Sequence, residues 1–286
     1  MDALINFLIS LLDSAATLVI ISIGLAVVFG MMRVINFAHG EFLMLGAFVT
    51  VSSVRTGVPF WLAIPVSGVA VGAFGLVVER LVIQRLYGRL AATMLATFGL
   101  SLIMVKCAEL IWGTSTQGIE TPLGSFRIGD YSFSVYTLVT IGAALVLLAG
   151  MLWVFTRTRF GIQARAATQL PGMAAALGVN ARRLSMLTFA LGSALAGVAG
   201  ALLAPVTAVT PNMGQAYIAQ AFTTVVVGGP AVVTGTASAG GLLGTTQTTI
   251  SELTTAVLGV AALLVTAIVV LRFLPTGLSG RSKAML

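Results

Sequence analysis

Long apolar stretches recur along nearly the whole chain, and they restrict its fold more than any other feature. The 286 residues are 58% hydrophobic and only 8% charged, whereas about a quarter of a soluble domain is charged. A membrane-spanning helix needs roughly 20 mostly apolar residues. The chain therefore has room for about eight or nine spans, and we expect an all-α, polytopic integral membrane protein. The expected spans are 14–33, 39–54, 59–83, 91–112, 134–156, 184–208, 216–230, 236–251 and 253–272.

The two segments at 216–230 and 236–251 are shorter than the others. Gly228, Gly229 and Pro230 interrupt the apolar pattern between them. Short, Gly/Pro-interrupted segments are typical of discontinuous helices near a transport pathway. Small residues also let helices pack closely. We therefore expect discontinuous helices near 216–251, with a packing role and a pathway role both open for the two glycines.

The basic residues are unevenly distributed over the expected loops. Twelve of the 15 lysines and arginines fall on one side of the membrane if the spans alternate, and the positive-inside rule makes that side cytoplasmic. This places the N-terminus outside and the C-terminus in the cytoplasm. The net charge of +7 then reflects cytoplasmic loops and not nucleic-acid binding. The twelve are Arg33, Arg80, Arg85, Arg89, Arg157, Arg159, Arg165, Arg182, Arg183, Arg272, Arg281 and Lys283.

Two loops stand out in an expected single transmembrane domain that covers 1–286. The external loop at 113–133 is polar and could cover a pathway, meet an external partner or only connect two spans. The cytoplasmic loop at 157–183 contains a short apolar segment at 172–179 that looks helical and has arginines on both sides. Such a helix suits docking of a cytoplasmic partner, or it rests at the lipid headgroups.

Several kinds of chemistry are absent from the sequence. It has no GxxxxGK[ST] phosphate-binding loop, no zinc-ligand spacing and a single histidine. We expect no enzymatic activity, no metal and no cofactor. Energy for uphill transport would come from an ion gradient or from a separate ATPase chain.

Three ionisable residues in or near the expected spans are candidates for a pathway, because a charge in a span is costly. Lys106 and Glu109 are three residues apart, so they share a helix face and can form an ion pair. Glu252 lies close to the expected outer boundary. A structural pair and a role in the pathway both remain open.

The most polar insertion at a helix junction runs from residue 33 to residue 41. Its polar side chains form a hydrogen-bonded turn between two helices, or they line the pathway. We expect Gly40 to permit a sharp backbone and Asn36 to cap the following helix. The residues of this junction motif are Arg33, Asn36, Phe37, His39, Gly40 and Glu41.

The same region carries a family resemblance. The run GLAVVFGMMRVINFAHGEFLMLGAF at 24–48 resembles the permeases of bacterial ABC importers for branched-chain amino acids. The run at 158–202 and the closing FLPTGLSGR at 273–281 resemble the same family, in the same order along the chain.

The resemblance implies a multi-pass permease subunit of the bacterial inner membrane, in a binding-protein-dependent importer. Its implied partners are a homologous second permease, two cytoplasmic ATPase subunits and an external solute-binding protein. The segment that would couple to the ATPase includes a glycine that lets the helix end close to the ATPase surface. The implied coupling residues are Ala174, Ala175, Ala176, Leu177, Gly178, Arg182 and Arg183.

Two features qualify this resemblance. Pro230 follows Gly229 where the family has a further glycine-rich pattern, and proline removes a backbone donor. The run YGRLAATMLATFGLSLI at 87–103 is similar to the related urea and short-amide permeases, so the solute is either a branched-chain or related amino acid, or urea or an amide. A stand-alone channel or ion-coupled carrier is the alternative from a different class.

Overall fold

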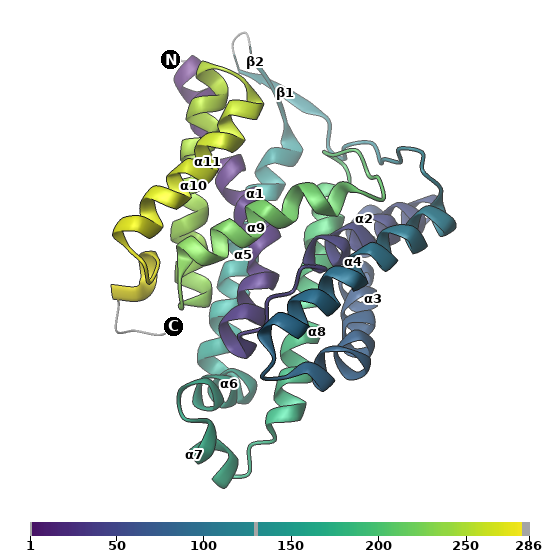
Figure 1. The fold of residues 1–286 in the computed structure, drawn as a ribbon. Helices are drawn as coiled ribbons and strands as arrows, with labels where there is room; N and C mark the ends of the chain where they lie inside the picture. Colours follow the sequence, from purple (N-terminus) through teal and green to yellow (C-terminus); the bar gives the residue numbers. More distant parts are fainter. Residues whose placement is uncertain (1, 129–130, 282–286) are drawn as a thin grey trace. The chain divides into compact units, whose positions relative to one another are not determined.

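The computed structural model describes residues 2–128 and 131–281, so Asp130 and Lys283 lie outside the described residues. Nearly all of the described chain is helical, as Figure 1 shows. The elements are α1 (Asp2–Met32), α2 (His39–Arg55), α3 (Phe60–Leu81), η1 (Ile83–Leu86), α4 (Leu90–Trp112), β1 (Ser125–Ile128), β2 (Tyr131–Ser134), α5 (Val135–Arg157), α6 (Arg159–Gln169), α7 (Pro171–Ala176), α8 (Ala181–Leu203), α9 (Met213–Gly228), α10 (Val232–Leu253), α11 (Ala256–Phe273) and η2 (Leu278–Arg281).

The expected all-α polytopic membrane fold is confirmed. Within the described residues, six helices are long and apolar enough to cross a membrane, and α9 with α10 makes up to seven. Those two helices are bent by 115° at their break. The number is lower than the eight or nine expected from sequence, because α2 has only 17 residues and the two short segments form one bent pair.

The chain divides into two compact units. One contains residues 1–23, 120–150 and 220–286, and the other contains 24–119 and 151–219. Helices α1, α5 and α9 therefore contribute residues to both. We describe each unit by itself.

In the second unit, small residues let α2, α3 and α8 approach closely. A Cβ built on Gly46 would lie 2.4 Å from the Gly197 carbonyl oxygen. A Cβ built on Gly200 would lie 1.9 Å from the Leu43 carbonyl oxygen. On α3, a Cβ on Gly75 would lie 2.5 Å from the Ser193 Cβ. Larger side chains would push these helices apart, so van der Waals contact between backbones holds them together.

Polar side chains and aromatic rings complete this packing. The Ser67 hydroxyl of α3 donates to the Gly46 carbonyl of α2 at 2.6 Å, and Thr50 donates to Ser67 at 3.1 Å. The ring of Phe42 lies 5.7 Å from that of Phe74 and 5.9 Å from that of Phe189. The core of the unit is therefore formed by α2, α3 and α8 around Phe42.

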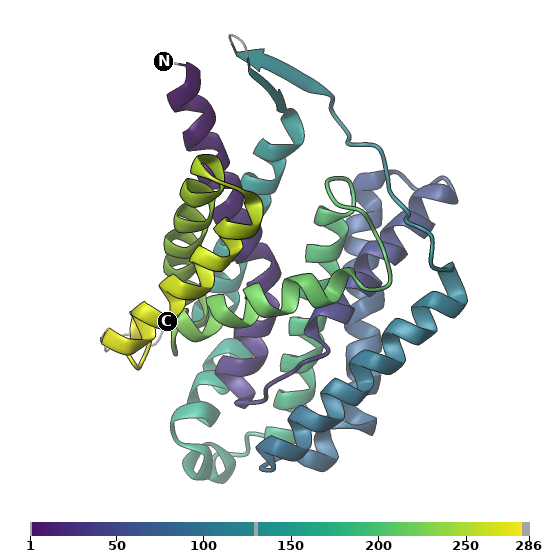
Figure 2. The ribbon, with the colours of Figure 1, turned by 45° about the horizontal axis from the view of Figure 1, so that its top comes forward.

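The first unit is built around α10. Helix α11 packs against α10, where a Cβ on Gly259 would lie 2.7 Å from the Gln247 carbonyl oxygen. A Cβ on Gly244 of α10 would lie 2.6 Å from the Ala15 amide nitrogen of α1. The antiparallel strands β1 and β2, four residues each, precede α5 (Figure 2).

Candidate coupling surface and helix junctions

The cytoplasmic loop of the sequence analysis folds as two short helices. Thr158 caps α6, since its hydroxyl oxygen accepts a hydrogen bond from the Gly161 amide at 3.2 Å. Helix α7 begins at Pro171, whose fixed φ angle and missing N–H suit the first helical position. The sequence predicted the second helix at 172–179, whereas α6 was not predicted.

Helix α7 ends in a Schellman motif. Gly178 has φ +85°, which favours glycine. Its amide donates to the Ala175 carbonyl, and the Val179 amide donates to the Ala174 carbonyl, both at 3.0 Å. Asn180 then caps α8 by accepting from the Arg183 amide at 3.0 Å. The chain therefore reverses between α7 and α8 in a defined geometry.

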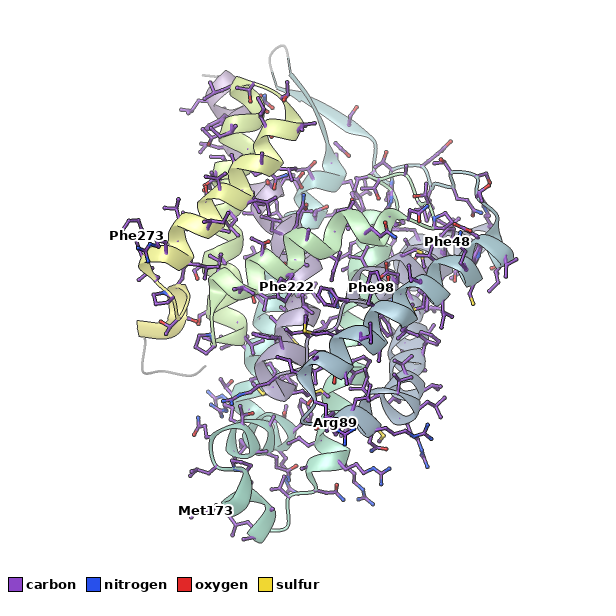
Figure 3. The ribbon with its side chains drawn as sticks, viewed as in Figure 1. Phe48, Arg89, Phe98, Met173, Phe222 and Phe273 are labelled. Atoms are coloured by element: carbon purple, nitrogen blue, oxygen red, sulfur yellow. The ribbon has the colours of Figure 1, made fainter. Side chains whose placement is uncertain are left out.

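Three large apolar side chains project from this reversal. Leu170, Met173 and Leu177 are 60%, 63% and 81% exposed, whereas Ala174 is buried behind them. We call these three residues the apolar tip. Figure 3 labels Met173 at the end of the α6–α7 segment, pointing away from the helices. Ala175, Ala176 and Gly178 are also exposed, so the predicted coupling residues of this segment other than Ala174 are accessible to a partner.

The two arginines of the predicted coupling set differ in their contacts. Both are exposed at the start of α8. The guanidinium of Arg182 donates to the side-chain oxygen of Gln84, which belongs to η1. The Arg182 side chain thus points toward η1, which follows α3. Arg183 instead contributes its backbone amide to the Asn180 cap.

The junction motif forms a non-helical link between α1 and α2. Asn36 Oδ1 accepts a hydrogen bond from the Ala38 amide at 3.1 Å. The Phe37 amide donates to the Thr97 hydroxyl of α4 at 3.1 Å. The backbone of Arg33, at φ +52°, makes the turn out of α1. The side chains of Asn36, His39 and Glu41 are buried, as a structural turn requires.

Two details of the motif differ from expectation. No described side chain caps α2, whose N-cap is Ala38. Asn36 lies two residues before that position, and its Oδ1 accepts from the Ala38 amide and not from an amide of the first helical turn. Gly40 is needed for close approach and not for a sharp backbone: a Cβ there would lie 2.2 Å from the Gly214 carbonyl oxygen. Ser101 hydrogen-bonds the carboxylate of the buried Glu41.

The break between α9 and α10 is held by the C-terminal segment. Gly229 has φ +82°, and a Cβ on it would lie 2.6 Å from the Thr276 carbonyl oxygen. The hydroxyl of Ser279 donates to the Gly228 carbonyl at 2.6 Å and accepts from the Ala231 amide at 3.1 Å. A single side chain therefore satisfies backbone groups on both sides of Pro230.

Replacing Ser279 with alanine should destabilise this break. The substitution leaves the Gly228 carbonyl and the Ala231 amide without their partner, at a cost of about 1–3 kcal/mol. Thermal unfolding in detergent should show a lower midpoint for Ser279→Ala. Ser238→Ala is the matched control, since among the described residues the Ser238 hydroxyl bonds only the Gly235 carbonyl of its own helix. Equal midpoints for the two variants would contradict the assignment.

Two of the three charged pathway candidates are paired with each other. Lys106 Nζ and Glu109 Oε2 form an ion pair at 2.7 Å on α4, with side chains 72% and 22% exposed. Glu252 is exposed near the end of α10. The pair of charges supports a structural role for Lys106 and Glu109.

The ion pair predicts an asymmetry between single and double variants. A lone charge costs about 2.5–3.5 kcal/mol at the centre of a span and less toward its end. Glu109→Gln leaves Lys106 unpaired in the second half of α4, so it should reduce the amount of folded protein in the membrane. Lys106→Met combined with Glu109→Gln removes both charges and should restore it. Quantitative immunoblotting of membranes measures this, and a double variant as poor as the single one would reject a purely structural pair.

Comparison with known families identifies the chain. The model of the family described as branched-chain amino acid transport system / permease component matches residues 7–273. The chain belongs to this permease family. It is therefore a multi-pass inner-membrane transport protein and not an enzyme, as the sequence predicted.

Individual relatives agree with this assignment. The permease is 28% identical to the high-affinity branched-chain amino acid transport system permease protein BraD of Pseudomonas aeruginosa, over 95% of this chain and 94% of the relative. It is 30% identical to LivH of Escherichia coli K12, over 94% and 92%. The fructose import permease protein FrcC of Rhizobium meliloti is 33% identical over a shorter region, which covers 42% of this chain and 32% of the FrcC chain. No solved structure gives a significant match.

The permease also has structural residues that the sequence analysis did not single out. Glu79 of α3 is fully buried and accepts a hydrogen bond from the Tyr87 hydroxyl. Burial and this contact with Glu79 raise the pKa of the Tyr87 hydroxyl, which keeps it a neutral donor. An acidic residue inside an expected span was the available signal for Glu79. No comparable pattern marks Ser279, since its partners are backbone groups.

Proposed function

We propose that the permease is one half of the transmembrane part of a binding-protein-dependent ABC importer. It pairs with a homologous second permease, two cytoplasmic ATPase subunits and an external solute-binding protein. The absence of a phosphate-binding loop from the sequence fits an energy source on another chain. The proposal takes the exposed residues 175–178 and Arg183 as the surface that docks on the ATPase, with the buried Ala174 beneath them.

The observation that carries the proposal is the apolar tip. Leu170, Met173 and Leu177 are three large hydrocarbon side chains on a segment with a rigid Schellman end. Exposed apolar side chains that gather in this way mark contact surfaces. A rigid tip also transmits force, since a flexible one would absorb the movement of its partner. Contact with lipid headgroups is the competing explanation, and the experiments below separate the two.

The proposed orientation puts the N-terminus outside and the C-terminus in the cytoplasm. It is supported by the arginines that flank the tip, Arg157, Arg159 and Arg165 on one side and Arg182 and Arg183 on the other. The apolar tip then faces the cytoplasm, where an ATPase can reach it. The polar segment at 113–133 faces outward.

The solute proposed for the importer is a branched-chain amino acid. The names of the relatives BraD and LivH support this choice, and both align along nearly the whole chain. A ligand screen on the partner binding protein would test it. Binding of leucine, isoleucine or valine is expected. Binding of urea or a short amide would instead assign the permease to the related urea and short-amide permeases.

Reconstitution tests the proposed mechanism. Proteoliposomes that contain the permease, its sister permease and both ATPases should take up leucine only with ATP and the binding protein present. Vesicles with this chain alone should show no uptake. ATP-independent uptake by the chain alone would reject the importer and favour a stand-alone channel or carrier.

A further inference from the structure

The second unit contains a cleft with three arginines where α3 and η1 meet the start of α8. Its volume is about 530 Å³, and a smaller cavity of about 200 Å³ next to it shares three of its residues and is also lined by Arg183. The residues of the larger cleft used below are Arg80, Leu81, Gln84, Arg85, Tyr87 and Arg182.

The positive charge of this cleft is not neutralised within the described part of the chain. No described carboxylate lies within ion-pair distance of Arg80, Arg85 or Arg182. Arg182 donates to the Gln84 side chain, a neutral acceptor. The nearby carboxylate of Glu79 is fully buried and accepts from the Tyr87 hydroxyl, and it forms no ion pair with the three guanidinium groups within the described residues. The arginines therefore present several free donors to a shared space.

The position of the cleft along α3 matches the boundary of a membrane. The apolar helical segment Phe60–Leu86 has 27 residues, more than the roughly 20 that cross the hydrocarbon core. Its last residues, from Arg80 onward, therefore reach the headgroup region. Val77 and Leu81, on either side of Arg80 in the sequence, are exposed four residues apart on one face of the helix.

We propose that this cleft binds the headgroup of an anionic phospholipid. Arginine forms bidentate hydrogen bonds with phosphate, and basic pockets between helices on the cytoplasmic side suit anionic headgroups. The phosphate would lie between Arg80, Arg85 and Arg182, and an acyl chain would lie along Leu81 and Val77. The cytoplasmic leaflet rests on the proposed orientation, but headgroup binding itself does not rest on the importer function.

The apolar flank favours a lipid over other anions. Free phosphate would use the arginines and leave Leu81 and Val77 exposed. An acidic surface of the ATPase is the other occupant that the charge allows, and it would use Arg183 and the apolar tip as well. These two occupants give different results in the following experiment.

The test measures lipid retention by the full-length permease in detergent. Native mass spectrometry after addition of phosphatidylglycerol or phosphatidylcholine should show that wild type retains the anionic lipid selectively. Each of Arg80→Gln and Arg85→Gln should weaken retention about fivefold, as expected for one arginine at a membrane surface. Arg80→Lys, which keeps the charge, should retain more than Arg80→Gln. Arg89→Gln is the control, since Arg89 is the N-cap residue of α4 and is not among the residues that line the cleft.

Three results would overturn the proposal. One is equal retention of phosphatidylglycerol by wild type, Arg80→Gln and Arg89→Gln. The second is complete displacement of phosphatidylglycerol by millimolar inorganic phosphate, which would indicate a site for free anions. The third is unchanged lipid retention by Arg80→Gln with loss of ATPase co-purification, which would assign the cleft to an acidic protein surface. Lipid retention is measured on this chain alone, so it can fail while ATP-driven uptake succeeds.

Discussion

Replacing Gly200 with valine should prevent the permease from reaching its native packing. Even the Cβ of alanine would lie 1.9 Å from the Leu43 carbonyl oxygen and 2.8 Å from the Ala47 amide nitrogen. Both are backbone atoms within α2, so no side-chain rotation relieves the clash. Overpacking in a core costs about 1–3 kcal/mol, and a clash with helix backbone should reach the upper end of that range or exceed it.

The measurement is the amount of folded protein and its thermal unfolding midpoint in detergent. Gly200→Ala should lower the midpoint, and Gly200→Val should leave little folded protein. Gly99→Ala is the control, because no atom beyond the neighbouring backbone of its own helix lies within 4 Å of a Cβ built there. Alanine is favoured over glycine in a helix by about 1 kcal/mol, so the Gly99 variant should be as stable as wild type or more so. Equal stability of Gly99→Ala and Gly200→Ala would contradict the close contact of α2 with α8.

Replacing Leu177 with aspartate should uncouple transport from ATP hydrolysis. Leu177 is the most exposed residue of the apolar tip, so the permease should fold normally. Moving an unpaired carboxylate into an apolar contact costs several kcal/mol, enough to separate the tip from its partner. Uptake by the complete importer should fall by about tenfold or more, since 1.4 kcal/mol corresponds to a factor of ten.

Parallel assays of uptake and ATP hydrolysis in proteoliposomes check this result. Hydrolysis should persist in Leu177→Asp while uptake is lost. Leu177→Met keeps an apolar side chain of similar size and should transport as wild type does. If the aspartate variant takes up solute at the wild-type rate, the tip is not the coupling surface.

Much of the fold could be predicted because apolar span length is a strong signal. The expected segments 59–83, 91–112 and 134–156 correspond closely to α3, α4 and α5. The break near Gly228 was also expected, since glycine and proline interrupt the pattern there. Uninterrupted apolar segments long enough to span a membrane thus predicted these helices.

The shorter and less regular elements could not be predicted in the same way. Helix α1 begins at Asp2, well before the expected start at residue 14. The sequence did not predict this early start because the charged Asp13 interrupts the apolar pattern. Strands β1 and β2 are only four residues each, too short for a clear alternating pattern. Nearly all of their residues fall within the polar loop that the sequence predicts at 113–133.

The sequence names candidate residues for the proposed coupling site but says nothing of their geometry. The sequence placed the coupling residues at 174–178 through a family resemblance, and their role remains a proposal. The fold adds that Leu170 and Met173 join Leu177 on one surface, which depends on the orientation of α7. It also adds that Gly40 faces Gly214, a contact between residues far apart in sequence that no local pattern reports.

Cross-linking from the apolar tip tests the central claim most directly. The single native cysteine, Cys107, is exposed and is first replaced by serine. Leu177→Cys, labelled with a maleimide–diazirine reagent in the assembled importer and illuminated, should give an adduct with the ATPase subunit. Leu110→Cys, an equally exposed position on α4, should give none. An assembled importer in which position 177 yields no ATPase adduct, or no more than position 110, would contradict the account.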